Sequence, residues 1–278
     1  MNDDQSNPTP PPPEYAPKGS AKAKLMTFAA TCHALPFFLW VGVMMLADMM
    51  HLLPDSGSEE VETLNLISHA GMYAARTGMC VVALLLLRPW RWYPAFKVKN
   101  LAPAIGIGLL VFVLWVGFET QFFKNLAPGL AELYEKWCVK PFGEIDGKRV
   151  ASYYVENPSP YMPAECGWPL LVTRLLGSAF VIAVIEEFFW RGYLLRTART
   201  PDFLDLDVGY YHPKSFFIIA VIFGLMHNEV AAAFVTALVY GYFYLFTRDI
   251  WAGVIAHVTT NLVLGIYAIL TGYWWFWV

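Results

Sequence analysis

The sequence predicts an all-α fold, a polytopic membrane helix bundle of about seven transmembrane helices. Of its 278 residues, 57% are hydrophobic and only 15% are charged, whereas a soluble domain is about half apolar and a quarter charged. The apolar residues form long blocks, several of which reach the roughly 20 residues that a helix needs to cross the hydrocarbon core. Only helices and closed barrels satisfy the backbone in lipid, and the long unbroken apolar runs exclude a barrel.

The first 25 residues are expected to form a disordered cytoplasmic tail. They include four consecutive prolines, Pro10 to Pro13, and a proline-rich polar stretch buries too little apolar surface to fold. The apolar block that follows is too long for the hydrophobic region of a secretory signal, and it has no small-residue cleavage pattern.

Seven apolar segments follow the tail. A single helix over 215–247 would exceed the bilayer thickness, so we expect it to divide near His227. A membrane region, 26–164, includes the long loop 119–168, and the remainder of the chain is 165–278. The predicted spans are 26–50, 66–87, 101–118, 169–195, 215–231, 232–247 and 250–270.

The basic residues predict the side of the membrane on which each loop lies. Lys and Arg occur in the tail, in the loop after the second span and at the ends of the fourth and sixth spans. The loop 51–65 carries acidic residues and no basic one. Because basic residues mark the cytoplasmic side, we expect the amino terminus inside, the carboxyl terminus outside and the loop 119–168 external.

The four cysteines form two groups. Cys32 and Cys80 lie within predicted spans, where a thiol behaves as a small hydrophobe. Cys138 and Cys166 share the long loop. They can form a disulfide if this loop faces an oxidising compartment, and two unrelated thiols are the alternative.

Two adjacent acids inside the fourth span mark the candidate site. A charge at the bilayer centre costs at least about 2.5 to 3.5 kcal/mol, so such a group normally lines a cavity. Glu187 and Arg191 are four residues apart and can form a structural pair on one helix face. Glu186 points about 100° away from that face and has no basic residue four positions on. Glu186 is therefore the free acid and the candidate general base.

Two further spans contribute polar groups at helical spacing. Phe223 and His227 are four residues apart, as are His257 and Asn261. A cavity that gathers a carboxylate, two imidazoles and an amide can hold and activate a water molecule. We expect Glu186 to take the proton from this water while His227 positions it. His257 and Asn261 are expected to donate to the oxyanion that forms at a scissile carbonyl.

Other polar groups in or near the spans have structural interpretations. His33 and His69 are interpreted as packing or interhelical hydrogen-bond residues. Arg76 either binds a substrate carboxylate or bonds to a span acid or a backbone carbonyl. Arg174 is expected to extend outward to the membrane interface. Glu229 either caps the turn between the fifth and sixth spans or reaches the site.

The combined pattern resembles one family of membrane proteases. It consists of three motifs in order along the chain: Glu186-Glu187-x3-Arg191, Phe223-x3-His227 and His257-x3-Asn261. Together they are similar to the motifs of the CPBP family, the CAAX proteases and bacteriocin-processing enzymes, over roughly 165–272. The flanking residues 189–192, 223–229 and 256–262 look closest to the CAAX-protease-related proteins of bacterial exosortase and PEP-CTERM sorting systems.

The resemblance implies an intramembrane glutamic endopeptidase of a bacterial inner membrane, with 165–278 as its catalytic core and no metal or other cofactor. Carried over, Glu186 and His227 activate the water, and His257 and Asn261 support the oxyanion. The supporting residues are Glu187, Arg191 and Phe223. The implied partners are membrane lipid and a peptide or protein substrate, with or without a lipid modification. A zinc ion stays an alternative, because Glu and two His are acceptable zinc ligands.

Two other function classes compete with the protease. A non-catalytic membrane scaffold or immunity-type binding protein would keep the same polar core for packing or binding. A small transporter is disfavoured, because no inverted repeat and no matching broken-helix glycine pattern is present. The net charge of −3 gives no basic face for nucleic acid, so no nucleic-acid partner is expected.

Overall fold

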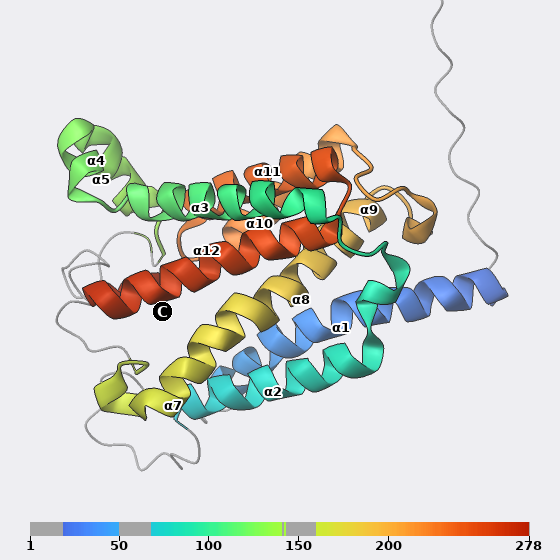
Figure 1. The fold of residues 1–278 in the computed structure, drawn as a ribbon, viewed down its shortest axis with the longest axis horizontal. Coiled ribbons are helices and arrows are strands. Elements are labelled where there is room, and N and C mark those ends of the chain that lie inside the picture. Colours follow the sequence, from blue (N-terminus) through green and yellow to red (C-terminus); the bar gives the residue numbers. More distant parts are fainter. Residues whose placement is uncertain (1–18, 50–67, 141, 143–159, 278) are drawn as a thin grey trace, which may run out of the picture.

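The structure is a computed structural model of the chain, and it describes residues 19–49, 68–140, 142 and 160–277. The described part is an all-helical bundle, which confirms the predicted fold class (Figure 1). Six of its helical segments are long and apolar enough to cross a membrane. Helix α10, Pro213–Leu225, has 13 residues and is shorter than these. Six full-length segments and one short helix thus correspond to the seven predicted spans.

The helices follow the predicted apolar blocks. The bundle consists of α1 (Ala21–Met49), α2 (His69–Leu87), α3 (Leu101–Gly117), α7 (Pro163–Leu176), α8 (Ala183–Glu187), α9 (Leu195–Thr197), α10, α11 (Val230–Thr247) and α12 (Ile250–Thr271). The segment from Pro163 to Thr197 is kinked at Gly167, where φ is 76°, and is helical from there on, because the π-helical segments η3 (Gly177–Ile182) and η4 (Phe188–Leu194) join α7, α8 and α9.

Helix α1 begins at Ala21, before the start predicted at 26. Residues 21–25 are Ala, Lys and Leu, which are good helix formers, and the Ser20 hydroxyl accepts a hydrogen bond from the Ala23 amide. The first turn of α1 thus lies before residue 25, so the predicted end of the tail is about one helical turn too late. Residues 1–18 of the predicted tail lie outside the described residues.

The 215–247 block divides near His227, as expected, but the fifth span ends at Leu225, six residues before the predicted end at 231. Helix α10 ends at Leu225 and α11 begins at Val230, so His227 lies in the short connection between them. The two helices pack against each other. This arrangement buries Glu229 and partly buries His227, whereas Asn228 between them is exposed.

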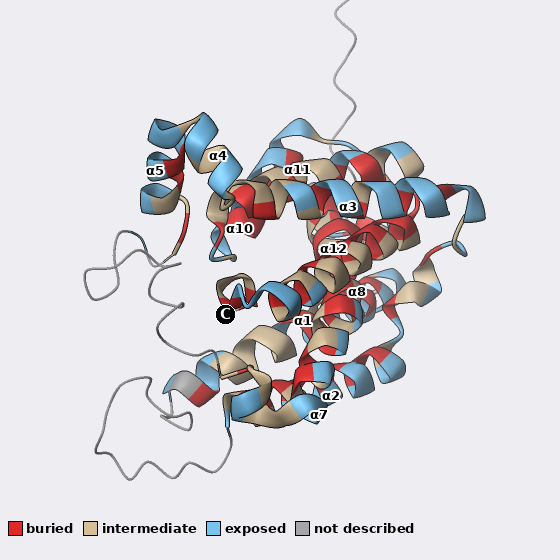
Figure 2. Cartoon of the chain, turned by 60° about the vertical axis from the view of Figure 1, so that its left-hand side comes forward, coloured by how far each residue is buried: buried red, intermediate tan, exposed pale blue. Residues whose placement is uncertain are grey.

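Helix α12 lies between α3 and α8 (Figure 1). Its close approach to α3 depends on Gly108, where an added Cβ would lie 2.4 Å from the Ala256 carbonyl oxygen. Figure 2 shows buried residues where α3 meets α12 and exposed residues on the opposite side of α3. That outer side carries large apolar residues such as Leu109 and Val113, as a face in contact with lipid would.

The basic residues of the loops gather at one end of the bundle. The start of α1 is tied to the segment after α9 by Lys22 Nζ and Asp205 Oδ2, 2.5 Å apart. The start of α3 is tied to the start of α12, because the Lys97 amide donates to Asp249 Oδ2 at 3.0 Å. This clustering matches the alternation that the charge rule requires, and the side that the end faces stays a prediction.

The predicted long loop 119–168 contains secondary structure that its polar composition did not suggest. Two short helices, α4 (Gln121–Leu126) and α5 (Pro128–Trp137), follow α3. Thr120 caps α4, since its hydroxyl accepts from the Phe123 amide. The last part of the loop begins α7 at Pro163. Residues 141 and 143–159 lie outside the described part.

Candidate active site

The two adjacent glutamates sit on a short α-helical turn between two π-helical segments. Helix α8 carries Glu186 and Glu187, with η3 before it and η4 after it. A π turn widens the helix by one residue and changes the direction of the side chains that follow, and such turns are frequent at functional sites.

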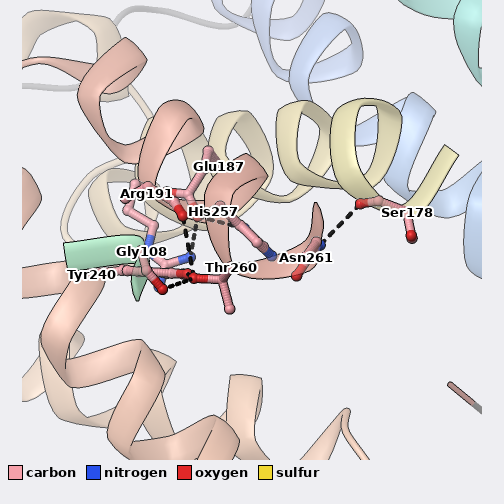
Figure 3. Close-up of polar contacts among 9 residues, drawn as sticks. Gly108, Ser178, Glu187, Arg191, Tyr240, His257, Thr260 and Asn261 are labelled. Carbon is pink, nitrogen blue, oxygen red and sulfur yellow. Dashed lines mark hydrogen bonds and ion pairs between the residues drawn. The ribbon is translucent and has the colours of Figure 1, made fainter. Parts of the chain in front are cut away.

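Glu187 is fully buried and binds two basic side chains (Figure 3). Its Oε1 accepts from Arg191 at 2.9 Å, which confirms the predicted pair four residues apart. The same oxygen accepts from His257 Nδ1 at 3.0 Å. Gly253 leaves room for this carboxylate, because a Cβ there would lie 3.0 Å from Oε2. Glu187 therefore links the first and third sequence motifs directly.

This contact determines how His257 can act. A carboxylate oxygen only accepts, so Nδ1 of His257 carries the hydrogen and Nε2 is left for a ligand. In the neutral ring Nε2 accepts a hydrogen bond, and in the imidazolium it donates one. Donation to an oxyanion therefore requires protonated His257. The Glu187 carboxylate fixes the orientation of the His257 ring, in the way that a buried acid orients a catalytic histidine.

The four predicted catalytic residues line one cavity of about 250 Å³. They come from different elements: Glu186 from α8, His227 from the α10–α11 connection, and His257 and Asn261 from α12. Oε2 of Glu186 is buried and has no hydrogen-bond partner among the described residues. A free carboxylate oxygen in a shared polar cavity is the arrangement that a general base for water requires.

His227 is held by the residue four positions before it. Its Nδ1 donates to the Phe223 carbonyl at 2.7 Å, and the two rings stack with centroids 4.4 Å apart. The edge of Trp115 approaches from α3, at 5.8 Å between centroids. Because Nδ1 donates, Nε2 is available to accept a proton or a hydrogen bond.

Asn261 joins α12 to the π-helical segment before α8. Its side-chain amide donates to the Ser178 carbonyl at 2.9 Å (Figure 3). This is the helix-joining contact expected of an intramembrane Asn. One amide hydrogen and the side-chain oxygen are left for a ligand in the cavity, so the contact orients the group without consuming it.

The cavity is also lined by Tyr240 and Thr260, which the sequence motifs did not identify. The Tyr240 hydroxyl bonds to Thr260 Oγ1 at 2.6 Å, and Thr260 donates to the Gly108 carbonyl at 2.7 Å. The Tyr240 ring lies 5.3 Å from His257. The signal for Thr260 was present in the sequence, because it follows His257 by three residues on the same helix.

Two arginines, Arg76 and Arg174, also line the cavity. The position of Arg174 differs from the one predicted from the sequence. Arg174 does not extend outward to the interface: it is 8% exposed, donates to the Trp277 carbonyl and lies 3.6 Å from the Tyr161 ring centroid. The segment Trp274–Trp277 folds back over α7 and covers it. Arg76 stacks on Trp40 at 3.8 Å and contacts its carbonyl at 3.5 Å.

Glu229 does not line the cavity within the described part of the chain. Its carboxylate instead accepts from the Tyr134 hydroxyl on α5. Burial, and then the charge of Glu119, raise the pKa of Glu229 to about 8. Glu229 precedes α11 without making a side-chain cap, so neither of its two predicted roles is observed.

The segment after α5 pairs with the connection that carries His227. The Lys140 amide donates to the Asn228 carbonyl at 2.9 Å, and the Val230 amide donates to the Cys138 carbonyl at 2.7 Å. This pairing holds the α10–α11 connection from the side opposite α11. The two segments are short and lie far apart in the sequence, and no periodic pattern connects them. Their pairing could therefore not be predicted from the sequence.

The structure also shows the state of the cysteines, the contacts of His33 and the placement of possible metal ligands. Cys138 and Cys166 are both free thiols, so the disulfide alternative is not observed. His33 is a buried packing residue, as predicted, with hydrogen bonds to the Ala29 carbonyl and to Tyr93. Within the described ranges, no group of three or more His, Cys, Asp or Glu side chains is placed to hold a metal ion.

Comparisons with known proteins give one match. No curated protein and no solved structure matches the chain. Residues 168–263 match the family model described as "Type II CAAX prenyl endopeptidase Rce1-like", and this range contains all three motifs and the four residues that share the cavity. The carboxyl-terminal part of the chain is thus similar to the Rce1-like CAAX endopeptidases, in line with the resemblance to the CPBP family that the three motifs carry.

Proposed function

We propose that the protein is an intramembrane endopeptidase that hydrolyses a peptide bond with a water molecule activated by Glu186 and His227. The observation that carries this proposal is the buried, unpartnered Oε2 of Glu186 in a cavity that His227, His257 and Asn261 also line. An acid without a partner at membrane depth is costly. A water molecule that it polarises accounts for its position.

The reaction follows from these placements. Glu186 takes a proton from water held between its carboxylate and Nε2 of His227, and the resulting hydroxide adds to the scissile carbonyl carbon. The oxyanion accepts from protonated His257 and from the free amide hydrogen of Asn261, which is the kind of preorganised donor pair that stabilises a tetrahedral intermediate. Glu186 then returns its proton to the leaving nitrogen, and the C–N bond breaks.

The residues that contact the candidate catalytic side chains have supporting roles in this proposal. Glu187 orients the His257 ring, Arg191 neutralises Glu187, and Phe223 fixes the ring of His227. The substrate we propose is a membrane-associated protein, with or without a lipid modification, of a bacterial inner membrane. An exosortase-type sorting system and a cytoplasmic amino terminus belong to the same proposal.

A quenched peptide library tests the proposal. Purified wild-type protein in liposomes is compared with Glu186→Gln and His227→Ala, with and without chelator. We expect cleavage by wild type, loss in both variants and no effect of the chelator. Cleavage that the chelator abolishes and zinc restores would overturn the metal-free mechanism.

One observation favours the scaffold alternative. The Glu187–Arg191–His257 cluster and the Asn261–Ser178 contact are satisfied within the protein, as a purely structural polar core would be. A scaffold should keep its cellular function in the Glu186→Gln variant, because the amide is nearly isosteric. Loss of that function in a stably folded variant would exclude the scaffold.

A further inference from the structure

The cavity contains two positive charges that the proposed reaction does not use. Arg76 on α2 and Arg174 on α7 line it together with Glu186 and His227. Both are more than nine-tenths buried, at 9% and 8% exposure. Buried charges within membrane-spanning segments are costly and normally pair with an opposite charge or serve a ligand.

No opposite charge meets these arginines in the described part of the chain. Neither forms an ion pair with a carboxylate there, and their Nε atoms have no hydrogen-bond partner among the described residues. The guanidinium carbons of Arg76 and Arg174 lie 5.1 and 4.8 Å from the centroid of the same ring, that of Tyr73. The two like charges are therefore close together, and no carboxylate among the described residues balances them.

Aromatic rings hold both guanidinium groups in place without neutralising them. Arg76 stacks on Trp40 at 3.8 Å, and Arg174 stacks on Tyr161 at 3.6 Å. Their partners within the protein are neutral carbonyl oxygens, those of Trp40 and Trp277. A planar guanidinium group held on a ring face keeps edge N–H groups available for a planar anion, and Arg suits a carboxylate in particular.

The distance along the helix between Arg174 and Glu186 corresponds to a few residues of an extended substrate peptide. Glu186 follows Arg174 by twelve positions in the same continuous helical segment, which corresponds to roughly 18 Å of axial rise. An extended peptide advances about 3.3 Å per residue, so a few residues bridge the distance.

We infer that Arg76 and Arg174 form a binding site for a carboxylate on the substrate peptide, a few residues from the bond that is cleaved. This inference rests on the proposed peptidase function, because the site and the candidate catalytic residues share one cavity. The carboxylate is either the peptide's own carboxyl terminus or an acidic side chain. In both cases it supplies the charge that the arginine pair lacks and sets the register of the substrate against Glu186.

Peptide binding without turnover tests this inference. The full-length Glu186→Gln protein, which keeps the cavity but lacks the base, is titrated with fluorescent apolar tetrapeptide pools of identical composition. One pool has free carboxyl termini and the second has carboxamide termini. The third has carboxamide termini and one Glu side chain. A charge-assisted pair predicts roughly tenfold to hundredfold tighter binding of the free-acid pool than of the carboxamide pool.

Variants assign the preference to the arginines. Arg76→Gln and the charge-retaining Arg174→Lys, each in the Glu186→Gln protein, should reduce the acid-to-amide ratio to threefold or less. Arg91→Gln, which removes an exposed arginine at the basic end of the bundle, should leave it unchanged. Size-exclusion profiles identify any variant that fails to fold. The third pool shows the source of the carboxylate: binding as tight as that of the free acids means a side chain, and weaker binding means the terminus.

Other outcomes would overturn the inference. Equal affinity for the free-acid and carboxamide pools would do so, as would a preference that survives in both arginine variants. Loss of anionic-phospholipid binding in these variants, without any effect on the peptides, would assign the pair to lipid instead. The proposed reaction fails separately: an intact acid preference with no library cleavage by wild type would leave a binding site without a peptidase.

Discussion

At the scale of single residues, the adjacent acids Glu186 and Glu187 have opposite surroundings. Glu187 accepts from Arg191 and His257, whereas Glu186 keeps a buried oxygen without a partner among the described residues. The position of Arg191, four residues after Glu187, predicted that Glu187 would be paired and that Glu186 would be free. It did not predict that His257 would contact Glu187, because that distance depends on how α8 and α12 pack.

The two acids should therefore respond differently to the same substitution. Glu187→Gln leaves Arg191 as an uncompensated buried charge, which should destabilise the protein by about 3 to 5 kcal/mol and lower the melting temperature in detergent. Glu186→Gln removes no partner and should melt within a few degrees of wild type. Equal melting temperatures for the two variants would contradict the observed pairing.

Glu229 should make stability depend on pH. Its folded pKa, about 8, lies above the ordinary value of 4.5, so the folded state retains a proton that the unfolded chain releases. The contribution to stability is complete below about pH 4.5 and is lost as the pH rises to about 8. The loss is on the order of a few kcal/mol, since one unit corresponds to about 1.4 kcal/mol.

Melting temperatures between pH 5 and 9 test the role of Glu229. Wild type should become less stable across this range, whereas Glu229→Gln, whose neutral amide can still accept from Tyr134, should change much less. Glu165→Gln alters an exposed carboxyl and should follow wild type. Parallel curves for wild type and Glu229→Gln would show that another group causes any pH dependence.

At the scale of elements, apolar length and helical spacing accounted for most of the fold and site. The predicted blocks correspond to α1, α2, α3, the α7–α9 segment, α10, α11 and α12. Spacings of four predicted Glu187–Arg191 and the ring pair Phe223–His227. Arg174 and the pairing of residues 138–140 with 228–230 were not predictable, because both depend on contacts between segments far apart in the chain.

The contact between α3 and α12 supports the site and should be sensitive to a single methyl group. A Cβ at Gly108 would meet the Ala256 backbone oxygen at 2.4 Å, which no side-chain rotation can relieve. Gly108→Ala should cost about 1 to 3 kcal/mol and reduce any peptidase activity, because α12 carries His257 and Asn261.

A second glycine on α3 provides the control for Gly108→Ala. Gly106 faces open space, with nothing within 4 Å of an added Cβ. Gly106→Ala should leave the melting temperature unchanged or raise it slightly, because Ala is the better helix former. Equal destabilisation by Gly106→Ala and Gly108→Ala would indicate general helix disruption rather than a close approach between α3 and α12.

At the scale of the whole molecule, the helices alternate so that one end of the bundle carries the basic loops and the other carries α4 and α5 (Figure 1). The charge rule places the basic end in the cytoplasm. In a cysteine-free background, Arg91→Cys should react with an impermeant maleimide only in inside-out vesicles, and Gln121→Cys only in right-side-out vesicles. Both target positions are exposed. The reversed pattern would invert the orientation.

The central claim is that Glu186 acts as the base for a water molecule within the bundle. The most direct measurement is the turnover of the best-cleaved library peptide by Glu186→Gln at saturating concentration, together with the affinity of that variant for the same peptide. We predict a kcat at least about a hundredfold lower, in line with the usual contribution of a general base, and an affinity within about threefold of wild type. Turnover within tenfold of wild type, in a variant that binds the peptide normally, would contradict the account.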